Sequence, residues 1–430
     1  MSAAAEDMPV LRTVLPAEVP TIDLDAVDPK ARDQAQAIID DVRAEGEEAL
    51  IRQAVRLGDL KSAEEPYVMG PEVLKQAFEA LPAGEQEVLT RTKDRVEAFA
   101  RAQLSAVGNS MEVAIPGGKA GHSVSPMTTA GCYAPGGRYP LPSSVIMTAV
   151  TARTAGVKTV VVASPRPAPA TAAAAHVAGA DLLICVGGAQ AVAAMAYGVG
   201  KVPACDVVVG PGNQWVTAAK SLVQASGRCA IDMLAGPSEV LVMVDDSASA
   251  DTVAADLLAQ AEHDVEARPI LVAVGSAEVV EKVDARLRVR LADLPTRETA
   301  AEAVKKGFAV VCKDVEEAVG VSDLIAPEHL EIQTRDAQAV ADKCLHYGGL
   351  FIGESAAEVL GDYGAGPNHV LPTGGTARNR GGLSVLDFLR VRTWMRLDDR
   401  AAASPLVRDA VQLARMEGLE GHARSAERRL

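Results

Sequence analysis

Three short apolar runs determine the fold of the chain: TVVVAS (residues 159–164), DLLICVGG (residues 181–188) and DVVVGPG (residues 206–212). Each run ends in, or is followed by, glycine or proline, and alanine-rich segments of helical composition lie between the runs. Continuous apolar runs that alternate with helices are typical of parallel strands buried on both faces. This stretch therefore predicts a doubly wound α/β unit.

A second series of apolar runs follows further along the chain. It consists of VLVMVDDSAS (240–249), PILVAVGS (269–276), FAVVCKD (308–314) and GGLFIGES (348–355). Helical segments connect these runs as well, so we predict an α/β fold with two Rossmann-like doubly wound units. Residues 1–27 are polar and proline-punctuated and indicate an N-terminal arm, and the chain after residue 376 indicates a glycine-rich turn followed by a helical tail.

Composition and charge exclude several classes of protein. Of 430 residues, 42 are basic and 57 acidic, which gives a net charge of −15, and only 3% are aromatic. Such a field repels nucleic acid and anionic lipid, and few aromatics are available to stack on bases. The six cysteines are scattered without a CxxC pattern, so they predict buried free thiols. With no secretory signal and no long apolar span, we expect a cytoplasmic protein without membrane or nucleic-acid partners. A plastid protein that has lost its transit peptide would have the same sequence features.

Glycine-rich turns follow the strands of the first unit, although the chain contains neither GxGxxG nor GxxxxGK[ST]. The turns are APGGRYP (134–140), VGGAQA (186–191) and VGPGNQW (209–215). Each carries or directly follows a side chain that could contact a cofactor, namely Tyr133, Gln190 and Asn213. Ligands of open α/β sheets bind at the carboxyl ends of strands, where such turns lie. Each turn alone is explained by turn chemistry, but three in succession favour a cofactor site.

The segment DTVAADLLAQAEHD (251–264) predicts a helix to about His263, with Ser249 as its N-cap. Val253, Leu257, Gln260 and His263 fall within an arc of about 120°, so the inward face becomes polar after two apolar turns. Buried polar groups need partners. Gln260 and His263 therefore bind either a metal ion or the backbone.

Three further motifs carry groups suited to chemistry. IAPEHLEI (325–332) contains the adjacent Glu328 and His329, a carboxylate and an imidazole that can transfer protons near neutral pH. GDYGAGPNHVLPTGG (361–375) contains Asp362 and His369, and the tail motif MEGLEGHARSAERRL (416–430) contains Glu417 and His422. Taken singly, they are also compatible with a solvated loop, surface turns and a terminal helix. The three histidines outside these motifs are expected to be structural; they are His122, His176 and His346.

The order of these motifs resembles the histidinol dehydrogenase family from about residue 30 to the C-terminus. The resemblance is carried by GCYAPGGRYPLPSSV, VGGAQAVAAMAYG, VGPGNQWVTAAK, IDMLAGPSEVLV, DLLAQAEHD, APEHLEI, GDYGAGPNHVLPTGGTAR and EGLEGHARSAERRL. It implies an enzyme that oxidises L-histidinol through L-histidinal to L-histidine, the last steps of histidine biosynthesis. It also implies reduction of two NAD per turnover, one zinc ion per subunit and an interlocked homodimer with shared active sites.

The resemblance also assigns roles residue by residue. It implies Gln260, His263, Asp362 and His422 as zinc ligands, with His422 donated by the partner. It implies Glu328 and His329 as the catalytic pair, and Tyr133, Gln190 and Asn213 as NAD contacts. The implied substrate contacts are Ser238, Gln260, His263, His329, Asp362, Glu417 and His422. A covalent route through Cys132 is not required by the motif.

The expected domains follow from the runs and the resemblance together. We expect an arm over residues 1–27, a zinc-binding and catalytic domain over 28–130 plus 239–375, an NAD-binding domain over 131–238, and a helical tail over 376–430 that crosses to the partner.

The segment GGTARNRGGLSVLDFLRVRTWMRLDD (374–399) departs from the family pattern. Paralogues in the same family oxidise other small polar alcohols, including sulfonated diols, so a paralogue is the first alternative. Glu417 and Ser238 favour a cationic amino alcohol, because a carboxylate attracts an ammonium group and repels a sulfonate. The second alternative, a catalytically silent metal- or nucleotide-binding module, is disfavoured because every expected catalytic position is filled.

Overall fold

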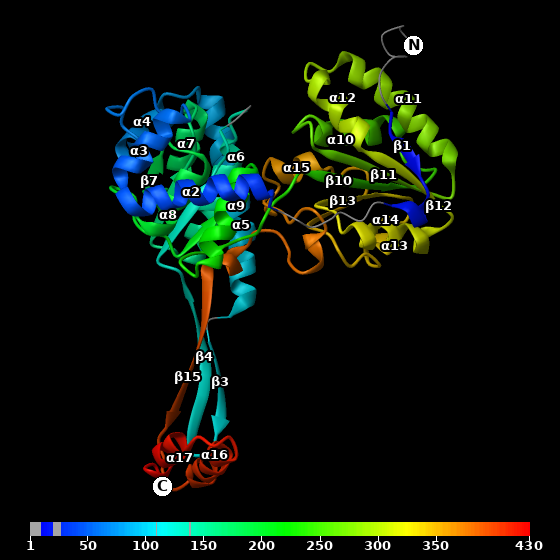
Figure 1. Ribbon diagram of the computed structural model, residues 1–430. Helices are drawn as coiled ribbons and strands as arrows, with labels where there is room; N and C mark the ends of the chain where they lie inside the picture. The colour runs from blue at the N-terminus through cyan, green and yellow to red at the C-terminus, as the bar shows by residue number, and fades with distance from the viewer. Residues whose placement is uncertain (1–9, 20–26, 109, 137–138) are drawn as a thin grey trace.

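The computed structural model describes residues 10–19, 27–108, 110–136 and 139–430. These residues form two six-stranded sheets, each flanked by helices, and a three-stranded stalk that carries the C-terminal helices away from both sheets (Figure 1). The two predicted α/β units are confirmed. Of the predicted arm, residues 1–9 and 20–26 lie outside the described residues, as do Gly137 and Arg138 of the first glycine-rich turn.

The first sheet has the order β2-β7-β6-β5-β8-β9. The strands are β2 (Val68–Met69), β5 (Thr129–Tyr133), β6 (Thr159–Ala163), β7 (Leu182–Ile184), β8 (Val207–Val209) and β9 (Ala230–Ile231). All pairs are parallel except β2 with β7. The central strands β5, β6 and β8 are largely buried, because helices cover both faces.

Among the described residues, eight helices cover this sheet. One face packs against α4 (Pro71–Glu79), α5 (Ala83–Val107), α6 (Pro142–Ala155) and α7 (Pro169–Val177). The other face packs against α2 (Pro29–Glu45), α3 (Glu47–Arg56), α8 (Gly188–Tyr197) and α9 (Gln214–Ala225). The helices of residues 29–107 thus lie on this sheet, which differs from the expected grouping of residues 28–130 with residues 239–375. We therefore propose that this helical segment belongs to the first sheet's domain.

The second sheet is entirely parallel, with the order β1-β12-β11-β10-β13-β14. Its strands are β1 (Arg12–Val14), β10 (Glu239–Val244), β11 (Arg268–Val274), β12 (Phe308–Cys312), β13 (His329–Gln333) and β14 (Gly349–Ile352). Helices α10 (Ala250–Ala261), α11 (Ala277–Asp293) and α12 (Arg297–Lys306) cover one face, and α13 (Val315–Ile325) and α14 (Ala337–Ala341) the other. Part of the expected arm is therefore an edge strand.

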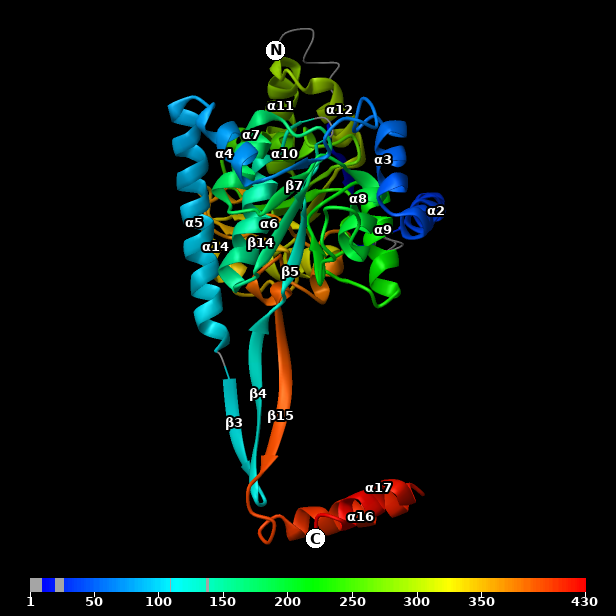
Figure 2. The same cartoon turned by 90° about the vertical axis from the view of Figure 1, so that its left-hand side faces the viewer.

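The stalk pairs β15 (Leu389–Leu397) with β4 (Gly118–Pro126), and β4 with β3 (Ser110–Ile115), all antiparallel. It ends in α16 (Ser404–Met416) and α17 (Glu420–Glu427), far from both sheets in two perpendicular views (Figures 1 and 2). The expected helical tail, residues 376–430, thus contains two short 3-10 turns and a long strand before its helices. Within the described ranges, no helix is long and apolar enough to cross a membrane, and the cytoplasmic location stays a prediction.

Candidate active site

Helix α10 brings Gln260 and the following turn brings His263 to the edge of the second sheet. The Ser249 hydroxyl caps the helix by accepting from the Thr252 amide at 3.3 Å, as the sequence predicts. The helix ends at Ala261, two residues earlier than expected. Gln260 is fully buried, whereas the His263 side chain is 38% exposed and so is accessible to a ligand.

Glu328 and His329 are buried together where β13 begins beside β10. The backbone N–H of Glu239, in the neighbouring strand, donates to Glu328 Oε2 at 3.0 Å. The Glu239 carbonyl oxygen lies 3.1 Å from His329 Nδ1, so that nitrogen donates to it. Within the part of the chain that the structure describes, His329 Nε2 has no hydrogen-bond partner and lies 3.7 Å from Asp362 Oδ1. The imidazole therefore offers Nε2 to the site.

A short helix, α15 (Glu358–Asp362), brings two carboxylates to the same place. His263 Nε2 lies 3.6 Å from Asp362 Oδ2 and 3.9 Å from Glu358 Oε1, and the three side chains could hold one metal ion. With its amide oriented to donate, the Gln260 nitrogen lies 3.1 Å from Glu358 Oε2. Sequence reasoning missed Glu358, although it lies one helical turn before Asp362 and so shares its face.

The electrostatics of this cluster are dominated by buried carboxylates. Burial raises the pKa of Glu328 to about 8 and that of Glu239 to about 7. Burial lowers the pKa of His329, but Glu358, Glu328 and Asp362 together raise it well above its usual range. Burial also opposes ionisation of Asp362, yet the nearby His329, His369 and His263 lower its pKa overall. A divalent cation among these carboxylates would balance their charge, and the nitrogen and oxygen donors suit zinc.

The loop after Asp362 docks on helices of the first sheet. His369 Nδ1 lies 2.9 Å from the Asp362 carbonyl oxygen, and its Nε2 lies 3.3 Å from the Ser144 hydroxyl of α6. Asn368 donates to the Met147 carbonyl oxygen at 2.9 Å, also in α6. Arg95 of α5 donates to the Gly364 carbonyl oxygen at 2.6 Å. The position of Asp362, beside the second sheet, therefore depends on how its loop packs against α5 and α6 of the first sheet.

The three residues expected to contact NAD lie at carboxyl ends of strands in the first sheet. The Tyr133 hydroxyl accepts from the Gly188 amide at 3.1 Å, and the Gln190 amide donates to Asp59 Oδ2 at 3.0 Å. Asn213 caps α9 and is exposed. Asp59, which sequence reasoning missed, also accepts from the Gly187 amide at 2.9 Å. The first amides of α8 are thus bonded internally, which agrees with the absence of GxGxxG, a motif that leaves such amides free for a pyrophosphate.

The remaining expected residues divide into two groups. Ser238 directly precedes Glu239, whose amide donates to the Glu328 carboxylate, and so lies beside the buried Glu328–His329 pair. Glu417 and His422 are exposed on the tail helices and are not brought to the cluster within one chain (Figure 2).

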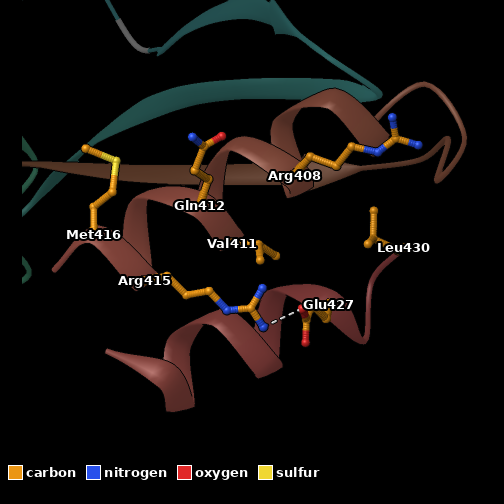
Figure 3. Close-up of a pocket in the computed structure, with 7 residues that line it drawn as sticks. All are labelled: Arg408, Val411, Gln412, Arg415, Met416, Glu427 and Leu430. Carbon is orange, nitrogen blue, oxygen red and sulfur yellow. Dashed lines mark hydrogen bonds and ion pairs between the residues drawn. The ribbon is translucent and has the colours of Figure 1, made fainter. Parts of the chain in front are cut away.

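A pocket between the two tail helices is lined by both charged and apolar side chains, including Val411, Met416 and Leu430 (Figure 3). It lies on the tail, away from the donor cluster, by which we mean Gln260, His263, Glu358 and Asp362.

Two parallel α/β units, with glycine-rich turns on one and a metal-type donor cluster beside a buried Glu–His pair on the other, define an α/β enzyme of the dehydrogenase class. The chain belongs to the histidinol dehydrogenase family, because the family model described as histidinol dehydrogenase matches residues 24–430.

Relatives of this chain cover almost its whole length. It is 45% identical to a histidinol dehydrogenase of Thermus thermophilus over 94% of this chain and 95% of that protein. It is 37% identical to a sulfopropanediol 3-dehydrogenase of Ruegeria pomeroyi over 93% and 92% of the two chains. A crystal structure of histidinol dehydrogenase from Elizabethkingia anophelis matches with a TM-score of 0.89, 28% identity, and coverage of 97% and 98%.

Docking of the Asp362 loop predicts different effects at two glycines of similar backbone conformation. Gly364 has φ +91° and an added Cβ would overlap a methyl group of Thr92, whereas Gly353 has φ +88° and open space around it. Gly353→Ala should cost only the left-handed strain, about 1–2 kcal/mol of unfolding free energy. Gly364→Ala should cost more and should also weaken metal retention. Thermal melts and metal analysis of both variants check this, and equal losses would contradict the docking role.

Proposed function

We propose that the protein is a zinc-dependent, NAD-linked histidinol dehydrogenase that converts L-histidinol through L-histidinal to L-histidine. The observation that carries this proposal is the buried Glu328–His329 pair lying directly against the donors Gln260, His263 and Asp362. Membership of the family and the 45% identical relative named histidinol dehydrogenase support the substrate.

The donor set fits one zinc ion per subunit. Gln260, His263 and Asp362 would hold it, with His422 of a second subunit as the fourth ligand. Glu358 accepts from the Gln260 amide nitrogen, which turns the amide oxygen away from this carboxylate and leaves it free as a ligand. When bound, zinc orients the substrate's polar groups and stabilises negative charge on its oxygen.

His329 is positioned to take the alcohol proton. Its Nδ1–H donates to the Glu239 carbonyl oxygen, so Nε2 faces the site. Glu358, Glu328 and Asp362 raise the pKa of His329 in the chain without metal, and the positive charge of a zinc ion among them would oppose this effect and favour the neutral imidazole that accepts the proton. Bound NAD supplies the acceptor for the hydride, and Tyr133, Gln190 and Asn213 are the proposed contacts for it.

Glu328 is positioned to activate water for the second oxidation. An aldehyde must add water before it can lose a second hydride, and a buried carboxylate with a raised pKa is a suitable base. The Glu239 amide holds Oε2, which leaves Oε1 to accept the proton of water. Closure of the site around the aldehyde would prevent its escape between the two steps.

The first alternative, a paralogue that oxidises a sulfonated diol, is disfavoured by the charge of the site. Asp362, whose pKa is lowered, is negatively charged beside the donors, and the proposed dimer would add the carboxylate of Glu417 of the partner subunit; carboxylates attract an amine or imidazolium group and repel a sulfonate. An assay of NADH formation with L-histidinol against a panel of small alcohols, sulfonated diols included, distinguishes the two. Preference for a sulfonated diol would overturn the proposed substrate.

His263→Ala should lose zinc. The site holds no thiolate that could compensate for the lost imidazole. Changing a residue that only hydrogen-bonds a metal ligand already weakens metal binding about 10–100-fold, so losing a ligand should weaken zinc binding by at least about 100-fold. Metal analysis after gel filtration measures this, with His346→Ala as the control histidine outside the cluster. Full zinc occupancy in His263→Ala would refute the ligand assignment.

Glu328→Gln should spare the first oxidation more than the second, because only the second needs activated water. The loss with L-histidinal should be on the order of 10²–10⁴, the effect of removing a positioned acid–base group. In the wild-type protein, the rate of the second step should rise with pH up to about 8 and then level off, because the carboxylate form grows as pH approaches that pKa. Single-turnover rates with each substrate check both points. If Glu328→Gln oxidised L-histidinal at the wild-type rate, Glu328 would not be the base.

We also propose a homodimer in which each tail completes the partner's site. In one chain, Glu417 and His422 lie on a tail that is held away from the donor cluster by the stalk (Figure 1). The tail exposes large apolar side chains, namely Leu413, Met416 and Leu419. Exposed apolar surface of this kind marks an interaction site, and a symmetric dimer would cover it while delivering two polar groups.

Mixing His422→Ala with Glu328→Gln under subunit exchange should restore activity. Neither variant alone should form L-histidine, whereas a heterodimer has one site with both changes and one site with neither. Formation of L-histidine should approach half of the wild-type value per heterodimer, with each variant mixed with itself as the control. If exchange is verified and no activity returns, the tail serves its own subunit.

A further inference from the structure

A buried ion pair holds both polar backbone groups of Gly210. The side chains of Lys220 and Asp232 are 2% and 0% exposed and form a salt bridge. Asp232 Oδ2 accepts from the Gly210 amide at 2.7 Å, and Lys220 Nζ donates to the Gly210 carbonyl oxygen at 2.8 Å. One residue is therefore fixed from two sides by opposite charges.

Gly210 lies where the proposed nucleotide contacts meet. It follows β8 in the turn of residues 209–215, has φ +114°, and an added Cβ would overlap the Tyr133 carbonyl oxygen. The same turn ends in Asn213, which caps α9. Because Gly210 touches the end of β5, its position sets the spacing between Tyr133 and Asn213.

The other end of the ion pair belongs to the segment that connects the two sheets. Asp232 directly follows β9 and begins the crossover, residues 232–238, which leads to Ser238 and then to Glu239 of β10. Thr217, three residues before Lys220 and on the same face of α9, donates to the Ala235 carbonyl oxygen of the crossover at 3.0 Å. Helix α9 therefore contacts both segments. Its N-cap Asn213 and Lys220 hold the nucleotide turn, and Thr217 holds the crossover.

Stability alone does not account for this arrangement. Removing two charges from water is costly, and well-packed apolar residues in place of a buried ion pair are often as stable or more so. Directional bonds to Gly210 are what apolar residues could not provide. We propose that Lys220 and Asp232 are positioning residues that fix the nucleotide turn against the crossover and thereby set the affinity for NAD. This inference rests on the proposed NAD site.

The double variant Lys220→Met/Asp232→Asn tests the inference. It removes both charges together, keeps an oxygen that can accept from the Gly210 amide, and leaves the Gly210 carbonyl oxygen without its donor. We expect a folded protein whose KM for NAD rises about tenfold, the effect of losing a charged hydrogen bond. The KM for L-histidinol should change by less than about twofold. Lys158→Met, the same substitution at an exposed lysine, is the control and should change neither constant.

An unchanged KM for NAD in the folded double variant would overturn the inference. If the double variant does not fold, Thr217→Val provides the test, because it removes only the bond to Ala235. The expected result is then an approximately threefold rise in the KM for NAD, and an unchanged value would overturn the inference. If the wild-type protein formed no NADH from L-histidinol, the proposed function would fail. Equilibrium dialysis of NAD against the same variants would then decide the role of the pair separately.

Discussion

The pairing of β10 with β13 is the constraint on which the site depends. It places Val240 opposite His329, so that the amide and carbonyl groups of Glu239 face Glu328 and His329. A slip of one residue would turn these side chains to the other face of the sheet. With this register, the backbone of Glu239 holds both the Glu328 carboxylate, the proposed general base, and the Nδ1 side of the His329 imidazole. The donor cluster of α10 and α15 then lies within reach of His329 Nε2.

The rest of the site draws on both sheets. The Asp362 loop rests on α5 and α6, while the crossover that enters β10 is tied to α9 of the first sheet. The proposed catalytic and nucleotide sites are therefore linked by packed elements. The tail is the exception, since the stalk carries its two polar candidates away from the cluster of the same chain, which is why we propose a shared site.

The sequence predicts those features that local pattern controls. The buried strands show as apolar runs, and the cap and polar end of α10 identify Gln260 and His263. The sheet that α2 to α5 cover was not predictable, because an amphipathic helix shows only that one face is buried. The stalk was missed since β15 is largely exposed and lacks a buried face. Glu358 and Asp59 were missed because isolated carboxylates are usually solvated, and only the fold shows that Glu358 is buried and that Asp59 is half-buried with hydrogen-bond partners.

The stoichiometry of NADH formation shows whether one site carries out both oxidations. With limiting L-histidinol and excess NAD, we expect two NADH formed per L-histidinol consumed, with L-histidine as the product and no free aldehyde accumulating. One NADH per L-histidinol with release of L-histidinal would contradict a single site for both oxidations. The second oxidation, for which Glu328 is the proposed base, would then not occur in this site.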